Sequence, residues 1–123
     1  MYLLDSCVVI AYFRKEEMDH KEAMTIIDQI DRFVITDYIL VEVVNILMMK
    51  EGIKVAQMVL KYLTSNKSIE IFRLDDDELD TVITDYQKLN KKISFADLSL
   101  KIIAQKRKLE LVTFDKQLKK IIK

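Results

Sequence analysis

The sequence contains no proline, one glycine, one cysteine and one histidine among its 123 residues. Collagen-like, low-complexity and linker-rich chains need many prolines or glycines, so these classes are excluded. Sandwiches and barrels need many tight turns with glycine or asparagine at positive φ, so an all-β fold is disfavoured. Half of the residues are hydrophobic and the charges balance, which argues against disorder. We therefore expect a folded chain in which helices dominate.

The scarcity of cysteine and histidine also limits the chemistry. Cys7 has no second cysteine to pair with, and His20 alone cannot form a histidine-rich metal site. Zinc, which prefers these two ligand types, is therefore disfavoured. The sequence shows no signal-peptide pattern and no run of 18 apolar residues. We expect a single domain over residues 1–123 that is cytoplasmic and does not enter a membrane.

The charges are unevenly distributed, although 20 basic residues balance 20 acidic ones. Residues 1–85 hold 9 Lys and Arg against 17 Asp and Glu, whereas residues 86–123 hold 11 against 3. The two parts therefore carry net charges of −8 and +8. Such asymmetry points to a polyanionic or charged partner, but lysines that merely solvate the last helices would give the same count.

Short apolar segments alternate with segments of helical periodicity. This alternation predicts βαβ units, and hence a parallel sheet covered by helices on both faces. The only glycine, Gly52, follows a helical segment at the position where a left-handed residue commonly ends a helix. Strands are predicted at 2–4, 33–35, 69–74 and 109–114, and helices at 6–14, 18–30, 37–51, 54–63, 75–89, 94–108 and 115–122.

Each predicted strand runs into an aspartate, at the edge of the sheet where parallel α/β proteins gather functional groups. Asp37 and Asp75 have a structural explanation, because both lie at helix starts where acids cap the helix. Asp5 and Asp115 follow apolar strands, where an uncompensated carboxylate is costly unless a metal, hydrogen-bond donors or water neutralise it.

Two further acids have unusual neighbours. Glu42 lies among apolar residues in the predicted third helix, and Asp97 follows Ser94 at a helix start. Each has a simple alternative, an exposed surface glutamate for Glu42 and a helix cap for Asp97. If Asp5, Glu42, Asp97 and Asp115 converge on one rim, their repulsion requires a hard cation, and oxygen ligands of this kind suit Mg²⁺ or Mn²⁺. Such an ion activates water and stabilises charge on a phosphodiester.

The succession of these motifs resembles the PIN domain, and within it the VapC type of toxin ribonuclease. The resemblance covers nearly the whole chain and implies a three-layer α/β/α fold with a short central parallel sheet of four or five strands. It also implies a metal-dependent endoribonuclease that hydrolyses RNA phosphodiester bonds with metal-activated water. The segments that carry it are Leu4-Asp5-Ser6, Val41-Glu42-Val43-Val44-Asn45-Ile46-Leu47, Ser94-Phe95-Ala96-Asp97-Leu98 and Val112-Thr113-Phe114-Asp115.

The resemblance assigns roles residue by residue. The catalytic acids would be Asp5, Glu42, Asp97 and Asp115. The metal ion, Mg²⁺ or Mn²⁺, would be bound by Asp5 and Asp97 foremost, and by Asp115. The supporting residues would be Ser6, Asn45 and Thr113, and a hypothetical RNA track in the basic segment would consist of Lys101, Arg107, Lys116 and Lys119.

The resemblance also implies partners. These are the RNA substrate, an antitoxin protein that wraps the toxin, and a second copy of the chain in a homodimer. The candidate interface is an apolar surface around Ile10, Phe13, Val43 and Met48, although methionine is more often core filler. The sequence departs from the family where a glycine often precedes the last strand, because Lys108-Leu109 stands there.

Other readings of the pattern remain open. A receiver-like phosphoacceptor domain needs a lysine after its last strand, where this chain has Asp115, and a dehalogenase-type phosphatase needs a second aspartate where Cys7 stands. The alternatives of greater weight are a non-catalytic interaction protein with the PIN fold and a free-standing RNA-processing nuclease.

Overall fold

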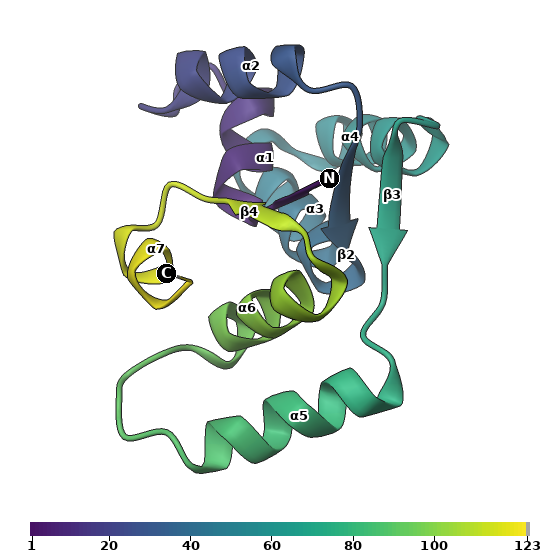
Figure 1. The fold of residues 1–123 in the computed structure, drawn as a ribbon. Helices are drawn as coiled ribbons and strands as arrows, with labels where there is room; N and C mark the ends of the chain where they lie inside the picture. The colour runs from purple at the N-terminus through teal and green to yellow at the C-terminus, as the bar shows by residue number, and fades with distance from the viewer. Residues whose placement is uncertain (123) are drawn as a thin grey trace.

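The computed structural model describes residues 1–122 and shows an α/β protein with a parallel sheet of four strands (Figure 1). The strand order across the sheet is β3-β2-β1-β4, and every neighbouring pair is parallel. The expected α/β class and parallel sheet are therefore confirmed. The strands are β1 (Tyr2–Leu4), β2 (Phe33–Thr36), β3 (Ile69–Phe72) and β4 (Glu110–Val112).

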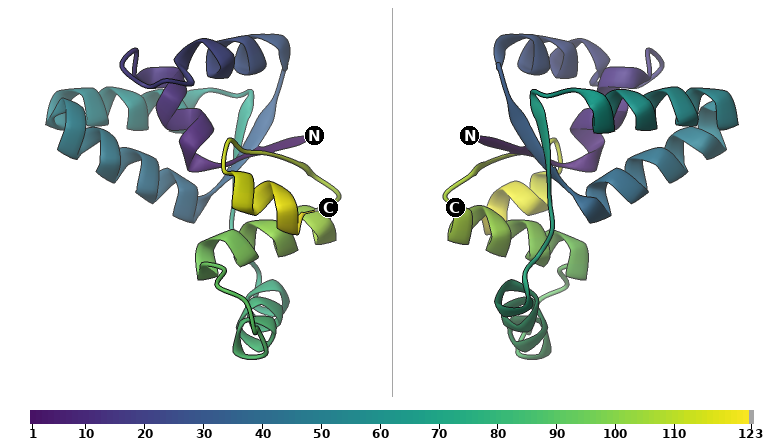
Figure 2. Two further views of the ribbon diagram at one scale, coloured as in Figure 1. Left: turned by 90° about the vertical axis from the view of Figure 1, so that its left-hand side faces the viewer. Right: turned by 90° about the vertical axis from the view of Figure 1, so that its right-hand side faces the viewer.

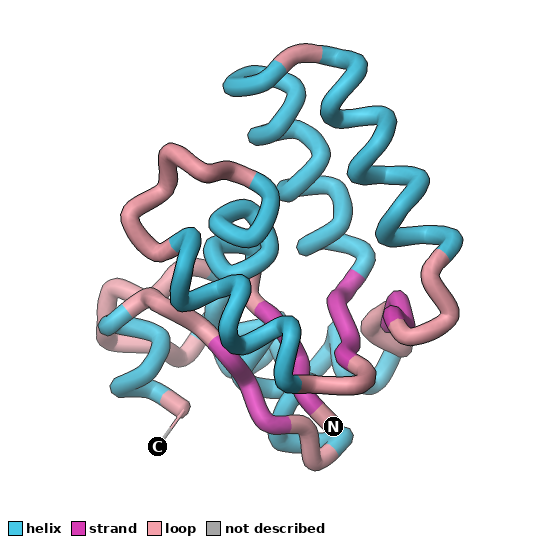
Figure 3. Tube along the Cα trace, turned by 90° about the horizontal axis from the view of Figure 1, so that it is seen from above, coloured by secondary structure: helices cyan, strands magenta, loops and turns pink. Residues whose placement is uncertain are grey.

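Helices cover both faces of this sheet and form three layers. Helices α1 to α4 gather on one side, while α6 and α7 lie on the other and α5 packs outside α6 (Figures 1 and 2). The trace coloured by secondary structure shows that the strands are short and that helices make up most of the chain (Figure 3). The helices are α1 (Ser6–Phe13), α2 (His20–Gln29), α3 (Asp37–Glu51), α4 (Ile53–Ser65), α5 (Asp76–Gln87), α6 (Phe95–Arg107) and α7 (Lys116–Ile121).

The inner strands explain why the sheet forms here. All four residues of β2 are buried, and Leu3 and Leu4 of β1 have no exposed surface. Continuous apolar strands of this kind are typical of a parallel sheet buried on both faces. Among the described residues, no helix is both long enough and apolar enough to span a lipid bilayer.

The strand order reverses direction at β1. From β1 the chain moves outward to β2 and β3, and it then returns to place β4 on the free edge of β1. Leu4 pairs with Val112 in this register, so Asp5 and Thr113 follow side by side at the carboxyl ends of their strands. A reversal of this kind opens a crevice at the carboxyl ends, where ligands of open α/β sheets bind.

The predicted start and end of helix α3 are confirmed. The Thr36 hydroxyl accepts a hydrogen bond from the Ile39 N–H at 3.1 Å and caps the helix. Gly52 ends it with φ of +98°, a conformation that residues with a β-carbon rarely adopt. These two residues fix the stretch of α3 that carries Glu42.

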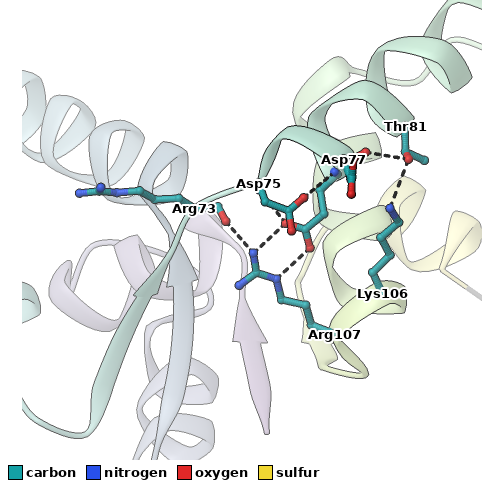
Figure 4. Close-up of polar contacts among 7 residues, drawn as sticks. Arg73, Asp75, Asp77, Thr81, Lys106 and Arg107 are labelled. Carbon is teal, nitrogen blue, oxygen red and sulfur yellow. Dashed lines mark hydrogen bonds and ion pairs between the residues drawn. The ribbon is translucent and has the colours of Figure 1, made fainter.

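Helices α5 and α6 form a pair that is held by a small apolar cluster and an ion pair. Val82, Leu98 and Ile102 are buried between them. At the other end, the Arg107 guanidinium donates to both carboxylate oxygens of Glu78, at 2.8 and 2.7 Å, and to the Arg73 carbonyl at 2.6 Å (Figure 4). Glu78 is almost fully buried, so this bidentate contact satisfies a charge that would otherwise be costly there.

The same contact explains why β3 is shorter than predicted. The predicted strand runs to Leu74, but the observed one ends at Phe72. The carbonyl of Arg73 is bonded to the side chain of Arg107, and Asp75 already caps α5 through the Glu78 N–H at 2.7 Å. The backbone therefore leaves the sheet early.

The expected apolar surface on α1 and α3 is wrong in part. Ile10 is buried and Val43 has no exposed surface, because both side chains point into the main core between the helices and the sheet. Phe13 is half-buried and packs edge-on against Tyr62. Of the four predicted interface residues, only Met48 is exposed.

The missing family glycine has a visible consequence at the end of α6. Lys108 adopts a left-handed conformation with φ of 54° and ψ of 48°, and its N–H bonds to the Ala104 and Gln105 carbonyls. The Leu109 N–H also bonds to the Ala104 carbonyl, at 2.8 Å. This helix end suits glycine, because a β-carbon costs about 1–2 kcal/mol in the left-handed region.

Replacing Lys108 with glycine is therefore expected to stabilise the protein. We expect Lys108→Gly to raise the free energy of unfolding by about 0.5–1 kcal/mol, since relief of strain outweighs the extra entropy of the unfolded chain. Denaturant unfolding followed by circular dichroism measures the change. The control is Gln105→Gly, an exposed position inside α6, where about 1 kcal/mol should be lost. Equal losses for both variants would contradict the account.

Candidate acidic site

A cavity of about 650 Å³ lies at the carboxyl ends of the strands, at the point where the sheet order reverses. The four acids predicted from the sequence all line it, although they come from four separate segments of the chain. Asp5 follows β1, Glu42 lies in α3, Asp97 in the first turn of α6, and Asp115 follows β4. The fold therefore brings the four predicted carboxylates to one place.

Asp5 is the most firmly held of the four. It is 7% exposed, and its Oδ1 accepts a hydrogen bond of 2.7 Å from the Ser6 N–H. Its Oδ2 accepts another bond of 2.7 Å from the Thr113 hydroxyl. These donors compensate the burial of the carboxylate, as the sequence required.

Thr113 links this carboxylate to the next one. Its hydroxyl is buried, donates to Asp5 and accepts the Asp115 N–H at 3.0 Å. Asp115 in turn caps α7, and its Oδ1 accepts the N–H of Gln117 at 2.9 Å. Thr113 therefore has the bracing contact expected of it, whereas the Ser6 hydroxyl lies 3.5 Å from Asp5 and contributes less.

Cys7 completes the connection between β1 and β4. Its thiol lies 3.5 Å from Asp5 Oδ2 and accepts the N–H of Phe114 at 3.4 Å. Burial, and after it the neighbouring negative charge of Asp5, raise the pKa of the Cys7 thiol. The side chain is therefore a neutral thiol at neutral pH and serves as part of the packing beneath Asp5.

Glu42 faces the cavity from α3 and has one polar neighbour on its own helix. The hydroxyl of Tyr38, one turn earlier, lies 3.5 Å from Glu42 Oε2. The charge of Glu42, then burial and the contact itself, raise the pKa of Tyr38. Glu42 is therefore a half-buried residue of the cavity and not a fully exposed surface glutamate. Asn45 is exposed and is absent from the cavity wall.

The electrostatics of the cavity are clearest at Asp97. Burial raises the pKa of this carboxyl, and the charges of Asp5, Asp115 and Glu42 raise it further. The Ser94 hydroxyl accepts the Asp97 N–H at 3.0 Å, so the predicted helix cap is present as well. Capping alone does not explain Asp97, because its carboxyl also faces the three other acids.

The acids share a cavity without forming a finished metal site. Within residues 1–122, no three side chains of His, Cys, Asp or Glu lie close enough together to hold one ion. The donors that line the cavity are nevertheless mainly oxygens, from carboxylates and hydroxyls. This donor chemistry matches Mg²⁺ and Mn²⁺, which bind through one or two carboxylates and retain several waters.

The residues predicted to contact RNA have different surroundings. Lys101 is half-buried beside the acidic cavity, and Lys116 and Lys119 are exposed on α7. Arg107 is bound to Glu78 and stacks over the Phe72 ring with 4.6 Å between its guanidinium carbon and the ring centre. The structure thus gives Arg107 a contact that joins α6 to α5.

Two cavity residues were missed by the sequence analysis. Tyr38 and Asp19 both line the acidic cavity. Tyr38 lies four residues before Glu42 on α3, so helical spacing from that acid could have identified it. Asp19 is in the segment between α1 and α2, and nothing local in the sequence indicates that this segment reaches the cavity.

Removing the charge of Asp97 is expected to stabilise the protein in the absence of metal. Its raised pKa means that the folded state favours the protonated carboxyl. The protein therefore has its full free energy of unfolding at low pH and loses part of it as pH rises through the folded-state pKa of Asp97. At neutral pH, Asp97→Asn should therefore raise the free energy of unfolding by about 0.5–1 kcal/mol. Denaturant unfolding in a chelator measures it.

The matched control is Glu22→Gln. Glu22 occupies the same third helical position in α2 but is exposed. Loss of its favourable interaction with the helix dipole should lower the free energy of unfolding by about 0.3–1 kcal/mol. If Asp97→Asn is destabilising by as much as this control, repulsion within the cavity is not significant.

Comparison with known proteins assigns the chain to a family. The model of the PIN domain family matches residues 2–123. No curated protein sequence matches the chain significantly. Among solved structures, VapC20 of Mycobacterium tuberculosis, a toxin that cleaves the sarcin–ricin loop, aligns with a TM-score of 0.87 at 12% identity and covers 98% of this chain and 95% of its own.

Two further structures align over most of both chains. A toxin–antitoxin complex from Klebsiella pneumoniae gives a TM-score of 0.67 at 19% identity, covering 94% of this chain and 87% of that one. VapBC2 from Rickettsia felis, bound to a DNA fragment from its promoter, gives a TM-score of 0.70 at 16% identity, covering 98% of this chain and 92% of that one. The chain belongs to the PIN domain family, and its fold is the one seen in VapC toxin structures.

Proposed function

We propose that the protein is an endoribonuclease dependent on Mg²⁺ or Mn²⁺ that hydrolyses RNA phosphodiester bonds. One observation carries the proposal: Asp5, Glu42, Asp97 and Asp115 line one cavity at the reversal point of the sheet. The raised pKa of Asp97 has the charges of the other three acids among its causes, so Asp97 lies within electrostatic range of all of them. A cavity that concentrates negative charge in this way suits a hard cation.

The residues of the cavity would have different roles. Asp5, Asp97 and Asp115 would hold the ion, and when bound it would supply a nucleophile at neutral pH and stabilise charge on the phosphate. Thr113 and Ser6 keep the Asp5 carboxylate in a fixed orientation. Glu42, whose Oε2 lies beside the Tyr38 hydroxyl, orients the attacking water and accepts its proton.

The ligands available in and near the cavity also suit an ion that retains water. Since no three ligands are preassembled among the described residues, Asp5, Asp97 and Asp115 would come together around the ion only when it binds, and waters or substrate phosphate would complete its coordination. Cys7 offers a neutral thiol, and the His20 ring is bonded to the Ala11 carbonyl at 2.7 Å. The cavity therefore favours Mg²⁺ or Mn²⁺ over zinc.

We further propose that the protein is the toxin of a toxin–antitoxin pair, acts in the cytoplasm as a single domain of residues 1–123, and forms a homodimer. The alignment with VapC structures supports this assignment, and two of the aligned structures are of a toxin–antitoxin complex and of VapBC2. A neighbouring gene for a small protein with a DNA-binding segment would support it, whereas an isolated gene would favour a free-standing RNA-processing nuclease.

Metal binding should stabilise the folded protein. At a free metal concentration about 100 times the dissociation constant, Mg²⁺ or Mn²⁺ should add about 2.7 kcal/mol to the free energy of unfolding. Thermal unfolding with metal and with chelator measures the shift. Asp97→Asn should reduce it strongly, whereas Asp28→Asn, an exposed change on α2, should leave it intact. No shift with either ion would contradict the metal assignment.

Catalysis should depend on the cavity acids. In a cleavage assay on a mixed RNA pool with Mg²⁺ or Mn²⁺, Asp5→Ala, Asp97→Asn and Glu42→Gln should each lower the rate by about 10²-fold or more. Asp85→Asn, an exposed change on α5, is the control and should cleave at the wild-type rate. If the wild type cuts nothing, the chain is a non-catalytic member of the family. If the cavity variants cut as well as the wild type, the cleavage does not come from the cavity acids and the assignment fails.

A further inference from the structure

A second cavity adjoins the acidic one and has the opposite charge. It measures about 620 Å³ and is formed by α6, α7 and the loop between α5 and α6. Asp97 lines both cavities, so they meet at this residue. The basic side chains that line the second cavity are Lys91, Lys92, Lys101 and Lys120, and we call it the lysine groove.

The lysines of this groove are available to a ligand. Within residues 1–122, none of the four forms an ion pair with a carboxylate. They come from three separate segments, two from the loop, one from α6 and one from α7, so the tertiary structure and not the local sequence gathers them. A cluster of unpaired ammonium groups in a hollow is a site for a polyanion.

The lysine groove is also lined by apolar and amide side chains. Leu89, Ile93 and Ile121 are half-buried apolar residues in its lining, and Asn90 and Gln117 supply two amides. Apolar surface accepts the face of a nucleobase, and amides can both donate to and accept from its edge. Lysines alone would suit any polyanion, but this combination suits a nucleotide.

A hollow formed by α1, α3 and the segment before α2 also borders the acidic cavity, but its positive charge is paired. That hollow shares Ser6, Cys7 and Asp19 with the acidic cavity, and its one cation is Lys50. Lys50 lies 3.9 Å from the Glu17 carboxylate. Among the described residues, the acidic cavity itself is lined by no lysine or arginine. A third hollow shares Phe114 with the acidic cavity, and its one lysine, Lys119, lies in a lining that also holds Glu22 and Glu110. Of the three hollows, the lysine groove therefore gathers the most positive charge beside the carboxylates.

We propose that the lysine groove is a nucleotide subsite that binds single-stranded RNA on one side of the scissile phosphate. The inference rests on the proposed ribonuclease function and deepens it. The four lysines hold the backbone phosphates, the apolar wall and the amides receive one base, and Asp97 marks the boundary with the cleavage site. The exposed Lys116 and Lys119 on α7 lie outside this groove.

The test measures RNA binding without catalysis. Anisotropy of a labelled single-stranded RNA of about ten nucleotides, titrated with protein in a chelator, gives the affinity and its salt dependence. The variants are Lys91→Ala with Lys92→Ala, and Lys101→Ala with Lys120→Ala. Each pair should weaken binding about 10-fold, and each lost phosphate contact should reduce the slope of log affinity against log salt by about 0.7.

A double variant serves as the matched control, and circular dichroism verifies that all variants fold. Lys54→Ala with Lys61→Ala removes two exposed charges on α4, away from the groove, and should change affinity less than twofold. If this control weakens binding as much as the groove variants, net charge and not the groove holds the RNA, and the inference is overturned.

A second comparison separates a nucleotide subsite from a general polyanion site. An aspartate oligomer and an abasic phosphodiester strand of equal charge replace the RNA. Both should bind more weakly than RNA, and their affinity should not respond to Asn90→Ala with Gln117→Ala, whereas that of RNA should fall. Equal binding of the aspartate oligomer would identify an acidic peptide as the ligand and overturn the nucleotide assignment.

The inference and the proposed function can fail separately. A wild-type protein that cleaves RNA while its groove variants bind like the control would retain the nuclease and overturn the subsite. A protein that binds RNA through the groove but cleaves nothing under any metal would retain the subsite and overturn the nuclease.

Discussion

The site depends on one hydrogen-bonded carboxylate. Asp5 is almost fully buried at the end of β1, and the Ser6 N–H and the Thr113 hydroxyl each donate to it at 2.7 Å. Thr113 reaches Asp5 only because β1 and β4 pair in register, with Leu4 beside Val112. The same hydroxyl accepts the Asp115 N–H, so a slip in this pairing would displace two of the four acids together. The geometry of the cavity is therefore set by the register of two three-residue strands.

The fold keeps Asp97 close to other carboxylates that repel it, an arrangement that lowers the stability of the free protein. Burial and the charges of Asp5, Asp115 and Glu42 raise the pKa of Asp97, so its carboxylate is held at a cost at neutral pH. Such a cost is typical of sites shaped for a ligand and not for the stability of the free protein. A bound cation would turn the same charges from an unfavourable interaction into a favourable one, which is the physical basis of the proposed metal dependence.

The packing of α5 against α6 bears on function although it lies outside the acidic cavity. The polar contacts of Arg107 (Figure 4) and the buried Val82, Leu98 and Ile102 fix the two helices together. The loop between these helices carries Lys91 and Lys92 into the lysine groove. A structural ion pair thus positions the charges proposed to bind RNA. The zero net charge of the chain conceals this separation of an acidic cavity from an adjoining basic groove.

The order and type of the helices and strands, the parallel sheet and the place of Asp5 and Asp115 at its edge were determined by the sequence itself, whereas the meeting of Glu42 and Asp97 with them was not. Periodicity and capping are local properties, and an aspartate after a parallel strand lies at the functional edge whatever the packing. The tertiary structure alone decided which side chains meet across elements. It buried Ile10 and Val43, paired Arg107 with Glu78 at a separation of 29 residues, and brought Lys91 and Lys120 to one groove. Such contacts depend on how elements that are distant in the sequence pack together, and this packing cannot be predicted from local sequence patterns.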